Sequence, residues 1–266
     1  MNRPRKYFGQ HFLHDQNVIR KLISAIAPEP RDHFVEIGPG HGALTRPLLE
    51  RVTKLDVIEI DHELARMLAE ELTNPHLTVH QADALKFDFR QIGAPPEGLR
   101  LAGNLPYNIS SPLLFHILSF GQIFRDIHVM LQKEVVARMT ATPGNKTYGR
   151  LTVALAARCQ VKSLFDIKPG SFRPAPRVNS SFVRLRPDAR QWSRIDDETS
   201  FDRLLRQAFN MRRKRLANAL KEMISEKEIE SLGIDPDLRA EQITVDSFIQ
   251  LGNYFAATVA DQSGHR

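Results

Sequence analysis

Four consecutive residues, Asn104-Leu105-Pro106-Tyr107, combine the groups needed to hold a planar ring that carries an amine. The Asn104 side-chain oxygen and the backbone carbonyl of Leu105 or Pro106 can each accept a hydrogen bond. Proline fixes φ and has no N–H, which stiffens the turn, and the Tyr107 ring offers a flat stacking face. The pattern favours a site for an adenine turned out of its strand, although Asn and Pro are also common in ordinary turns.

A glycine-rich turn at residues 38–42 follows an apolar run at 33–37 and precedes a helical pattern at 43–51. Glycines let the backbone approach a ligand closely, and the start of a helix adds partial positive charge. Glu59 ends the next apolar run, about 20 residues after the glycines, where a carboxylate can accept hydrogen bonds from ribose hydroxyls. This arrangement predicts a nucleotide-type cofactor.

Two cofactors fit this turn. Residues 38–43 satisfy the relaxed dinucleotide fingerprint, so an NAD-dependent oxidoreductase is one interpretation. Glu36, just ahead of the glycines, would repel a pyrophosphate but tolerate the cationic methionyl part of S-adenosylmethionine. Asp83, after the third apolar run, could accept a hydrogen bond from an adenine amino group. We therefore favour S-adenosylmethionine, held by residues at successive strand ends: Gly38, Glu59, Asp83 and Asn104.

Short apolar runs alternate with helical patterns up to about residue 160. Asp61 is expected to cap a helix that runs to about Leu72. Strands separated by helices predict an α/β fold with a parallel sheet covered on both faces. Ligands of such sheets bind at the carboxyl ends of the strands. The predicted strands are 33–37, 55–60, 77–80, 99–102 and 127–131.

The pattern changes after residue 186. We predict a first domain at 1–186, a linker at 187–197, and a small all-helical domain at 198–266. Between Arg203 and Lys221 the chain has seven basic residues and no acidic one. A run of four, Arg212-Arg213-Lys214-Arg215, would wrap more than one helix face, which favours a nucleic-acid surface over a solvated one.

Composition agrees with a polyanionic partner. The 266 residues carry a net charge of +6, the pI is about 9.6, and 42% of the residues are hydrophobic. The single cysteine, Cys159, excludes an internal disulfide, and no metal-ligand spacing is evident, so we expect no metal. No apolar run reaches the roughly 18 residues of a membrane span and no signal segment follows the basic N-terminus, so we expect a cytoplasmic protein.

Together these motifs resemble the ribosomal RNA adenine dimethylase family over nearly the whole chain. The resemblance implies a Rossmann-like, class I S-adenosylmethionine-dependent methyltransferase sheet followed by a small helical domain. It implies that His11 and Leu13, in the segment 8–13, contact the cofactor. Many members have Asn where this chain has His11, so a backbone contact is expected there. It also implies that Phe172, which begins the proline-rich segment 172–180, stacks on the target adenine opposite Tyr107.

The resemblance further implies the substrate. It points to methylation of N6 on two adjacent adenosines near the 3′ end of 16S rRNA, giving N6,N6-dimethyladenosine within an immature small ribosomal subunit. Arg212, Arg213, Lys214 and Arg215 would contact this RNA, and the enzyme would act as a monomer. A non-catalytic RNA-binding assembly factor with the same fold remains an alternative, as does the oxidoreductase.

Overall fold

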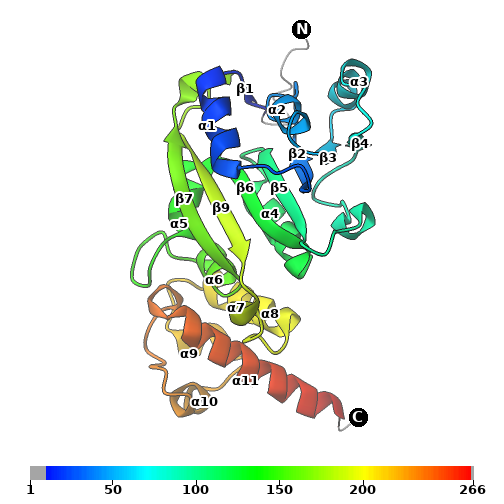
Figure 1. Ribbon diagram of the computed structural model, residues 1–266. Helices are drawn as coiled ribbons and strands as arrows, with labels where there is room; N and C mark the ends of the chain where they lie inside the picture. The colour runs from blue at the N-terminus through cyan, green and yellow to red at the C-terminus, as the bar shows by residue number, and fades with distance from the viewer. Residues whose placement is uncertain (1–9, 265–266) are drawn as a thin grey trace. The chain divides into compact units, whose positions relative to one another are not determined.

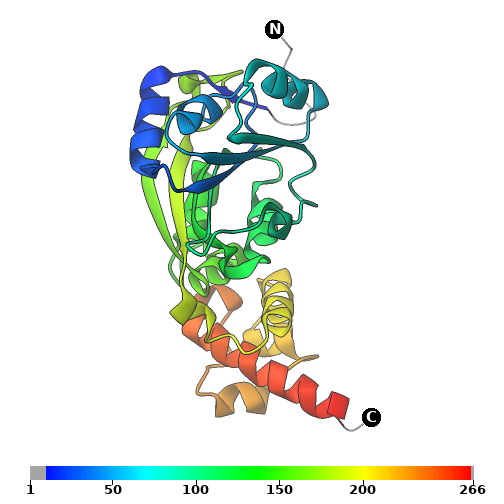
Figure 2. The same cartoon turned by 45° about the vertical axis from the view of Figure 1, so that its right-hand side comes forward.

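The computed structural model describes residues 10–264, which divide into two compact units (Figure 1; Figure 2). The first unit comprises residues 10–136 and Lys162–Pro187, and the second comprises Ala137–Val161 and residues 188–264. The first unit ends at Pro187, and the first domain was predicted to end at residue 186. The prediction did not assign 137–161 to the second unit.

A seven-stranded sheet in the order β4-β3-β2-β5-β6-β9-β7 forms the centre of the first unit. The pairs β4–β3, β3–β2, β2–β5 and β5–β6 are all parallel, as the alternation of strands and helices predicts. Their carboxyl ends therefore meet at one edge. These strands are β2 (His33–Ile37), β3 (Lys54–Glu59), β4 (Leu77–Gln81), β5 (Leu99–Asn104) and β6 (Phe124–Gln132).

The sheet is not parallel throughout. Strand β9 (Ser180–Pro187) pairs antiparallel with β6, and β7 (Cys159–Ile167) is the edge strand beside β9. The expectation of a parallel sheet is wrong at this edge, because the serines and arginines of β9 and the polar residues of β7 hide the apolar signal. A separate two-stranded sheet pairs β1 (Phe12–Leu13) with β8 (Phe172–Arg173).

The first unit's helices follow local sequence signals. Asp15 caps α1 (Gln16–Ile26) by accepting hydrogen bonds from the Asn17 and Val18 N–H groups. Asp61 caps α3 (His62–Glu71), as predicted, by accepting from the Glu63 N–H. The remaining helical segments are α2 (Thr45–Leu49), η2 (Phe89–Ile92), α4 (Ser110–Leu118), η3 (Gly121–Ile123), α5 (Lys133–Met139) and η4 (Pro169–Ser171).

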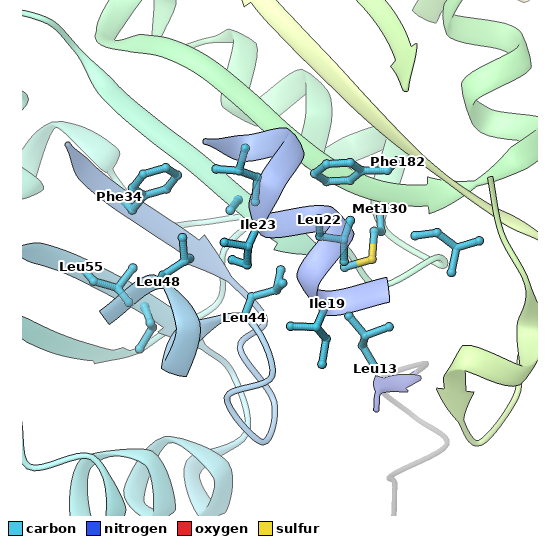
Figure 3. Close-up of a cluster of buried hydrophobic side chains, with 14 of the residues drawn as sticks. Leu13, Ile19, Leu22, Ile23, Phe34, Leu44, Leu48, Leu55, Met130 and Phe182 are labelled. Carbon is cyan, nitrogen blue, oxygen red and sulfur yellow. The ribbon is translucent and has the colours of Figure 1, made fainter. Parts of the chain in front are cut away.

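Helices α1 and α2 cover one face of the sheet (Figure 3). Leu22 and Ile23 of α1 pack in one cluster with Phe34, Met130 and Phe182, which come from strands. Such a cluster fixes the strands relative to one another because protein interiors are close-packed. The edge of the sheet at which the carboxyl ends meet is thereby held in place.

A buried ion network ties α1 to the sheet. The Arg100 side chain, only 6% exposed, donates to Asp32 Oδ2 at 2.6 Å and to Asp126 Oδ1 at 2.9 Å. It also donates to the carbonyls of Ile26 and Ala27, at the end of α1, at 2.7 and 3.1 Å. Burial alone would raise the pKa of Asp126, but the His128 ring, with its Nδ1 atom 3.5 Å from Asp126 Oδ1, and the hydrogen bonds from Arg100 bring it well below its usual range.

The second unit is helical apart from the start of β7. Helix α8 (Glu198–Asn210) packs beside α11 (Val245–Gly264), as Figure 2 shows in yellow and red. Residues 137–161 join this unit because α6 (Arg150–Ala156) packs against α8, and the Tyr148 hydroxyl donates to the Ile243 carbonyl at 2.8 Å. The other helices are α7 (Ala189–Trp192), α9 (Leu216–Leu220), α10 (Glu226–Ser231) and η5 (Ala240–Gln242).

The segment 187–197 is not a free linker. It contains α7, and the side chains of Trp192 and Ile195 are only 7% and 8% exposed. The Trp192 indole N–H donates to Glu198 Oε1 at 2.8 Å. Its polar composition suggested a linker because those two apolar residues are isolated in the sequence.

Candidate functional site

The four residues predicted at successive strand ends lie at one cavity. The strand order β4-β3-β2-β5 places the carboxyl ends of these strands side by side. Gly38, Glu59, Asp83 and Asn104 all line a cavity of about 910 Å³, toward the upper end of the range for ligand pockets, about 300–1,000 Å³. Five further predicted residues also line it: His11, Leu13, Leu105, Pro106 and Tyr107.

The glycine turn wraps closely around this cavity. Gly38 and Gly40 have φ of +66° and +57°, which side chains rarely adopt. A Cβ at Gly40 would lie only 2.8 Å from the Phe12 ring. The Gly40 N–H donates to Glu59 Oε2 at 3.2 Å, which joins the turn to the end of β3.

Glu59 is held by backbone donors. Besides the Gly40 contact, its Oε1 atom accepts from the Asp61 N–H at 3.0 Å, and the residue is 4% exposed. Burial raises the pKa of this carboxyl. Each carboxylate oxygen has a second lone pair, so Glu59 can still accept hydrogen bonds from a pair of hydroxyls.

Glu36 is the cavity's second buried carboxyl. It is 2% exposed and accepts a hydrogen bond from the Thr45 hydroxyl at 2.7 Å. Burial, with a further contribution from the charge of Glu59, raises the pKa of Glu36 to about 8. At neutral pH the group is therefore mostly protonated, so its charge is a weaker argument against a pyrophosphate than the sequence suggested.

We predict that Glu36→Gln flattens the pH dependence of thermal stability. The wild-type pKa of about 8 exceeds the ordinary value of 4.5, so the folded state holds the extra proton. The stability that the protonated Glu36 carboxyl contributes is therefore fully present below about pH 4.5 and is lost as the pH rises toward about 8. Gln cannot ionise but still accepts from Thr45. Calorimetric Tm values between about pH 6 and 9 should fall less for the variant, and parallel curves would contradict the prediction.

Asp83 follows β4 and faces the same cavity. Its Oδ1 atom accepts from the Leu85 N–H at 2.9 Å, which fixes the carboxylate in its turn. Among the described residues its Oδ2 atom has no hydrogen-bond partner, which leaves an acceptor for an amino group of a ligand.

Asn104 has one end of its amide occupied and the other unpaired. The Nδ2 group donates to the His11 carbonyl at 2.7 Å. The Oδ1 atom is buried and has no hydrogen-bond partner within the described part of the chain. A buried acceptor without a donor is costly, so such an atom is typical of a site built for a ligand.

The backbone carbonyls of Leu105 and Pro106 are the two candidates for the second acceptor, and they differ in whether a donor already binds them. The Pro106 carbonyl accepts from the Ile109 N–H at 3.2 Å as part of the turn. No donor within residues 10–264 reaches the Leu105 carbonyl. Leu105 is therefore the better candidate for the second acceptor beside Asn104.

Tyr107 has one of its ring faces covered. The His11 ring stacks on it, with centroids 5.3 Å apart and an angle of 29° between planes. The Tyr107 hydroxyl shares a hydrogen bond with the hydroxyl of Ser180, at the start of β9. These contacts fix the ring at the cavity wall.

Phe172 does not occupy its predicted place. Its side chain is only 2% exposed and packs in the core cluster with Leu13, Met130 and Phe182. In the two-residue strand β8, adjacent side chains alternate, so Phe172 points inward while Arg173 is exposed and lines the cavity. The expectation of Phe172 facing Tyr107 as a stacking ring is therefore wrong for this structure.

Sequence reasoning missed three neighbours of the cavity. Phe12 and His41 bring their ring centroids to 4.5 Å of one another across the glycine turn. Arg173 is the single Lys or Arg among the described residues that line the cavity. The stretch from Lys168 to Arg186 contains no acidic residue, which was an available signal for Arg173. Phe8 and Gly9, also quoted for the family resemblance, lie outside the described residues.

The basic run of the second unit differs from its prediction in two ways. It lies in the turn between α8 and α9, not around a helix. Arg212 pairs with Glu241 at 2.6 Å, and Arg215 pairs with Glu226 at 3.0 Å and also with Asp237. Arg213 and Lys214 are exposed and form no ion pair within the part of the chain that the structure describes.

Two searches of the described residues were negative. No group of three or more His, Cys, Asp or Glu side chains is placed to hold a metal ion among residues 10–264. Within the same range, no helix combines the length and the apolar character that crossing a bilayer requires.

Comparisons with known proteins agree on one family. The sequence model of a family described as ribosomal RNA adenine dimethylase matches residues 1–257. A protein of Aromatoleum aromaticum named ribosomal RNA small subunit methyltransferase A is 52% identical over 256 residues, which are 96% of each chain.

Two solved structures of methyltransferases have a similar fold. A dimethyladenosine transferase from Plasmodium falciparum is similar with a TM-score of 0.76 and 26% identity, over 93% of this chain and 98% of that one. The 23S rRNA methyltransferase ErmE, 23% identical over 92% of this chain and 99% of its own, shares the fold with a TM-score of 0.69.

Proposed function

Because the chain belongs to the ribosomal RNA adenine dimethylase family, and so is an rRNA adenine dimethyltransferase, we propose its detailed reaction. It methylates N6 of two adjacent adenosines near the 3′ end of 16S rRNA, giving N6,N6-dimethyladenosine. The substrate is an immature small ribosomal subunit in the cytoplasm, and the enzyme acts as a monomer. The observation that carries the proposal is the buried, unpaired Asn104 Oδ1 atom at the cavity edge. Neither the family nor the relatives support the NAD-dependent oxidoreductase.

The cavity fits S-adenosylmethionine by the chemistry of its donors and acceptors. Glu59, at the end of β3, would accept hydrogen bonds from the ribose hydroxyls, and Asp83 from the adenine amino group. Gly38 and Gly40 keep the turn free of side chains where the chain of the cofactor would pass. The His11 backbone and Leu13, both at the cavity wall, would cover the cofactor from the N-terminal side.

The residues of the Asn104–Tyr107 turn would act on the target base. Asn104 Oδ1 and the Leu105 carbonyl would accept the two N6–H bonds, which favours a more tetrahedral nitrogen with its lone pair free. When bound, S-adenosylmethionine would supply an electrophilic methyl group whose C–S bonding pair stays with sulfur. The turn would hold the N6 lone pair toward that methyl group, and the proton that N6 loses as the C–N bond forms would pass to solvent. Positioning and polarisation are therefore the main demands on the protein, and a strong base is not needed.

The second methylation makes a further demand on this turn. Monomethylated N6 has one N–H left, so one of the two acceptors loses its donor after the first round. The Asn104 amide is held in place by the hydrogen bond from its Nδ2 group to the His11 carbonyl. We propose that Asn104 keeps its hydrogen bond in both rounds.

We predict that RNA binding depends on two residues of the basic run. Replacing Arg213 and Lys214 with Ala should make the slope of log affinity against log salt shallower by about 1 to 2, because phosphate contacts release counterions. Arg212 and Arg215 are left intact because their ion pairs hold the turn. Lys227→Ala, an exposed lysine of α10, is the matched control. An unchanged slope in the double variant would show that this turn does not contact RNA.

Mass spectrometry of nucleosides tests the proposed function directly. Small subunits that lack the modification are incubated with the enzyme and S-adenosylmethionine, and their RNA is digested. We expect N6,N6-dimethyladenosine, in two copies per subunit. Binding of the subunit without any methylated adenosine would instead favour the non-catalytic assembly factor.

A further inference from the structure

Tyr107 is the aromatic ring of the Asn104–Tyr107 turn, and two contacts fix its orientation. Its hydroxyl is hydrogen-bonded to Ser180 Oγ, and its ring stacks on His11. A tyrosine side chain has two rotatable bonds, so a contact at the ring and a second at the hydroxyl leave it little freedom.

The Ser180 contact comes from a rigid element. Ser180 is fully buried at the start of β9, where it pairs with Gln132 of β6 in the antiparallel ladder. Its hydroxyl is therefore fixed by the sheet and not by the loop that precedes it. Burial raises the pKa of the Tyr107 phenol, which keeps its proton available for this bond.

The His11 contact is fixed at both ends of the residue. Its Nδ1 atom lies 2.7 Å from the Pro174 carbonyl, and since a carbonyl only accepts, Nδ1 donates. Its own carbonyl accepts from Asn104 Nδ2. The imidazole therefore covers one face of Tyr107 as part of a connected set of contacts.

We propose that Ser180 is the positioning residue that sets the angle of the Tyr107 ring. The inference rests on the proposed function, since it concerns how the target adenine is held. The adenine stacks on the free face of Tyr107, while His11 supports the opposite face. The Ser180 hydroxyl touches neither the base nor the cofactor and acts only through Tyr107.

A double-mutant cycle of Tyr107→Phe and Ser180→Ala tests the positioning role in the full-length enzyme. Each single variant should lower kcat/KM for the subunit about 3- to 10-fold, the usual value of one hydrogen bond. The double variant should be no worse than the poorer single variant, because both remove the same bond. Ser181→Ala is the matched control, since the neighbouring hydroxyl donates instead to Asp166 Oδ1 at 2.6 Å.

A second readout separates positioning from general destabilisation. An RNA carrying 2-aminopurine at the target position should lose fluorescence when the base stacks on Tyr107. Tyr107→Phe and Ser180→Ala should both weaken this quenching, and Ser181→Ala should not.

The possible results distinguish failure of the Ser180 role from failure of the proposed function. Additive losses in the cycle, or full activity and quenching in Tyr107→Phe, would overturn the role of Ser180, even if Ser180→Ala fails to fold. If the wild-type enzyme forms no dimethyladenosine, the proposed function itself fails, whereas an active wild type with an additive cycle refutes only this inference.

Discussion

Asn104→Ala should lower methyl transfer by about 10²- to 10³-fold while leaving RNA affinity nearly unchanged, by analogy with the loss of one preorganised hydrogen-bonding group at a reacting centre. The variant removes the buried acceptor that would orient the N6 amine. The turn with Arg213 and Lys214, which we propose contacts RNA, lies in the other unit and keeps its residues. Single-turnover rates and equilibrium binding on the same RNA measure the two effects separately.

Two further variants assign the effect to one atom. Asn104→Asp keeps an Oδ1 acceptor but loses the donor to the His11 carbonyl, so it should retain more activity than Asn104→Ala if the acceptor matters most. Asn108→Ala changes an exposed asparagine of the same loop and should stay near wild type. Full activity in Asn104→Ala, or an equal loss of RNA affinity, would contradict the assignment of Asn104.

The parallel part of the fold and the edge that carries the cavity were predictable from sequence. Apolar runs and helical patterns alternate there, and each run ends in a residue that can bind a ligand, such as Glu59 or Asn104. Because parallel neighbours have their carboxyl ends at one edge, the sequence order alone predicts that these side chains meet.

The sequence-based predictions that differ from the structure concern contacts between residues that are distant in sequence. Whether Phe172 faces the cavity or the core depends on its pairing with Leu13, which no local pattern shows. The ion pair of Arg212 depends on Glu241, 29 residues away. The protonation of Glu36 depends on burial by the whole unit. Residue type predicts a chemical group at these positions but not its partner.

Arg100→Met should lower the free energy of unfolding by about 3–5 kcal/mol, the usual cost of removing one partner of a buried ion pair. The variant leaves the carboxylates of Asp32 and Asp126 buried without their shared guanidinium. It also removes the donors to the carbonyls at the end of α1. Chemical denaturation at neutral pH measures the change, and Arg90→Met, in an exposed pair with Asp88, should change stability little.

The pH dependence of this loss identifies its cause. The lowered pKa of Asp126 means that its contribution is present above the ordinary value of 3.8 and is lost as pH falls below it. In Arg100→Met, burial should instead raise the pKa values of Asp126 and Asp32, so that these groups protonate at higher pH. The gap in stability between the wild type and the variant should therefore narrow as pH falls from about 7 toward about 4. A gap that stays constant with pH would mean that Arg100 stabilises the fold by packing on Phe34, which its guanidinium also covers at 4.8 Å, and not by its charge.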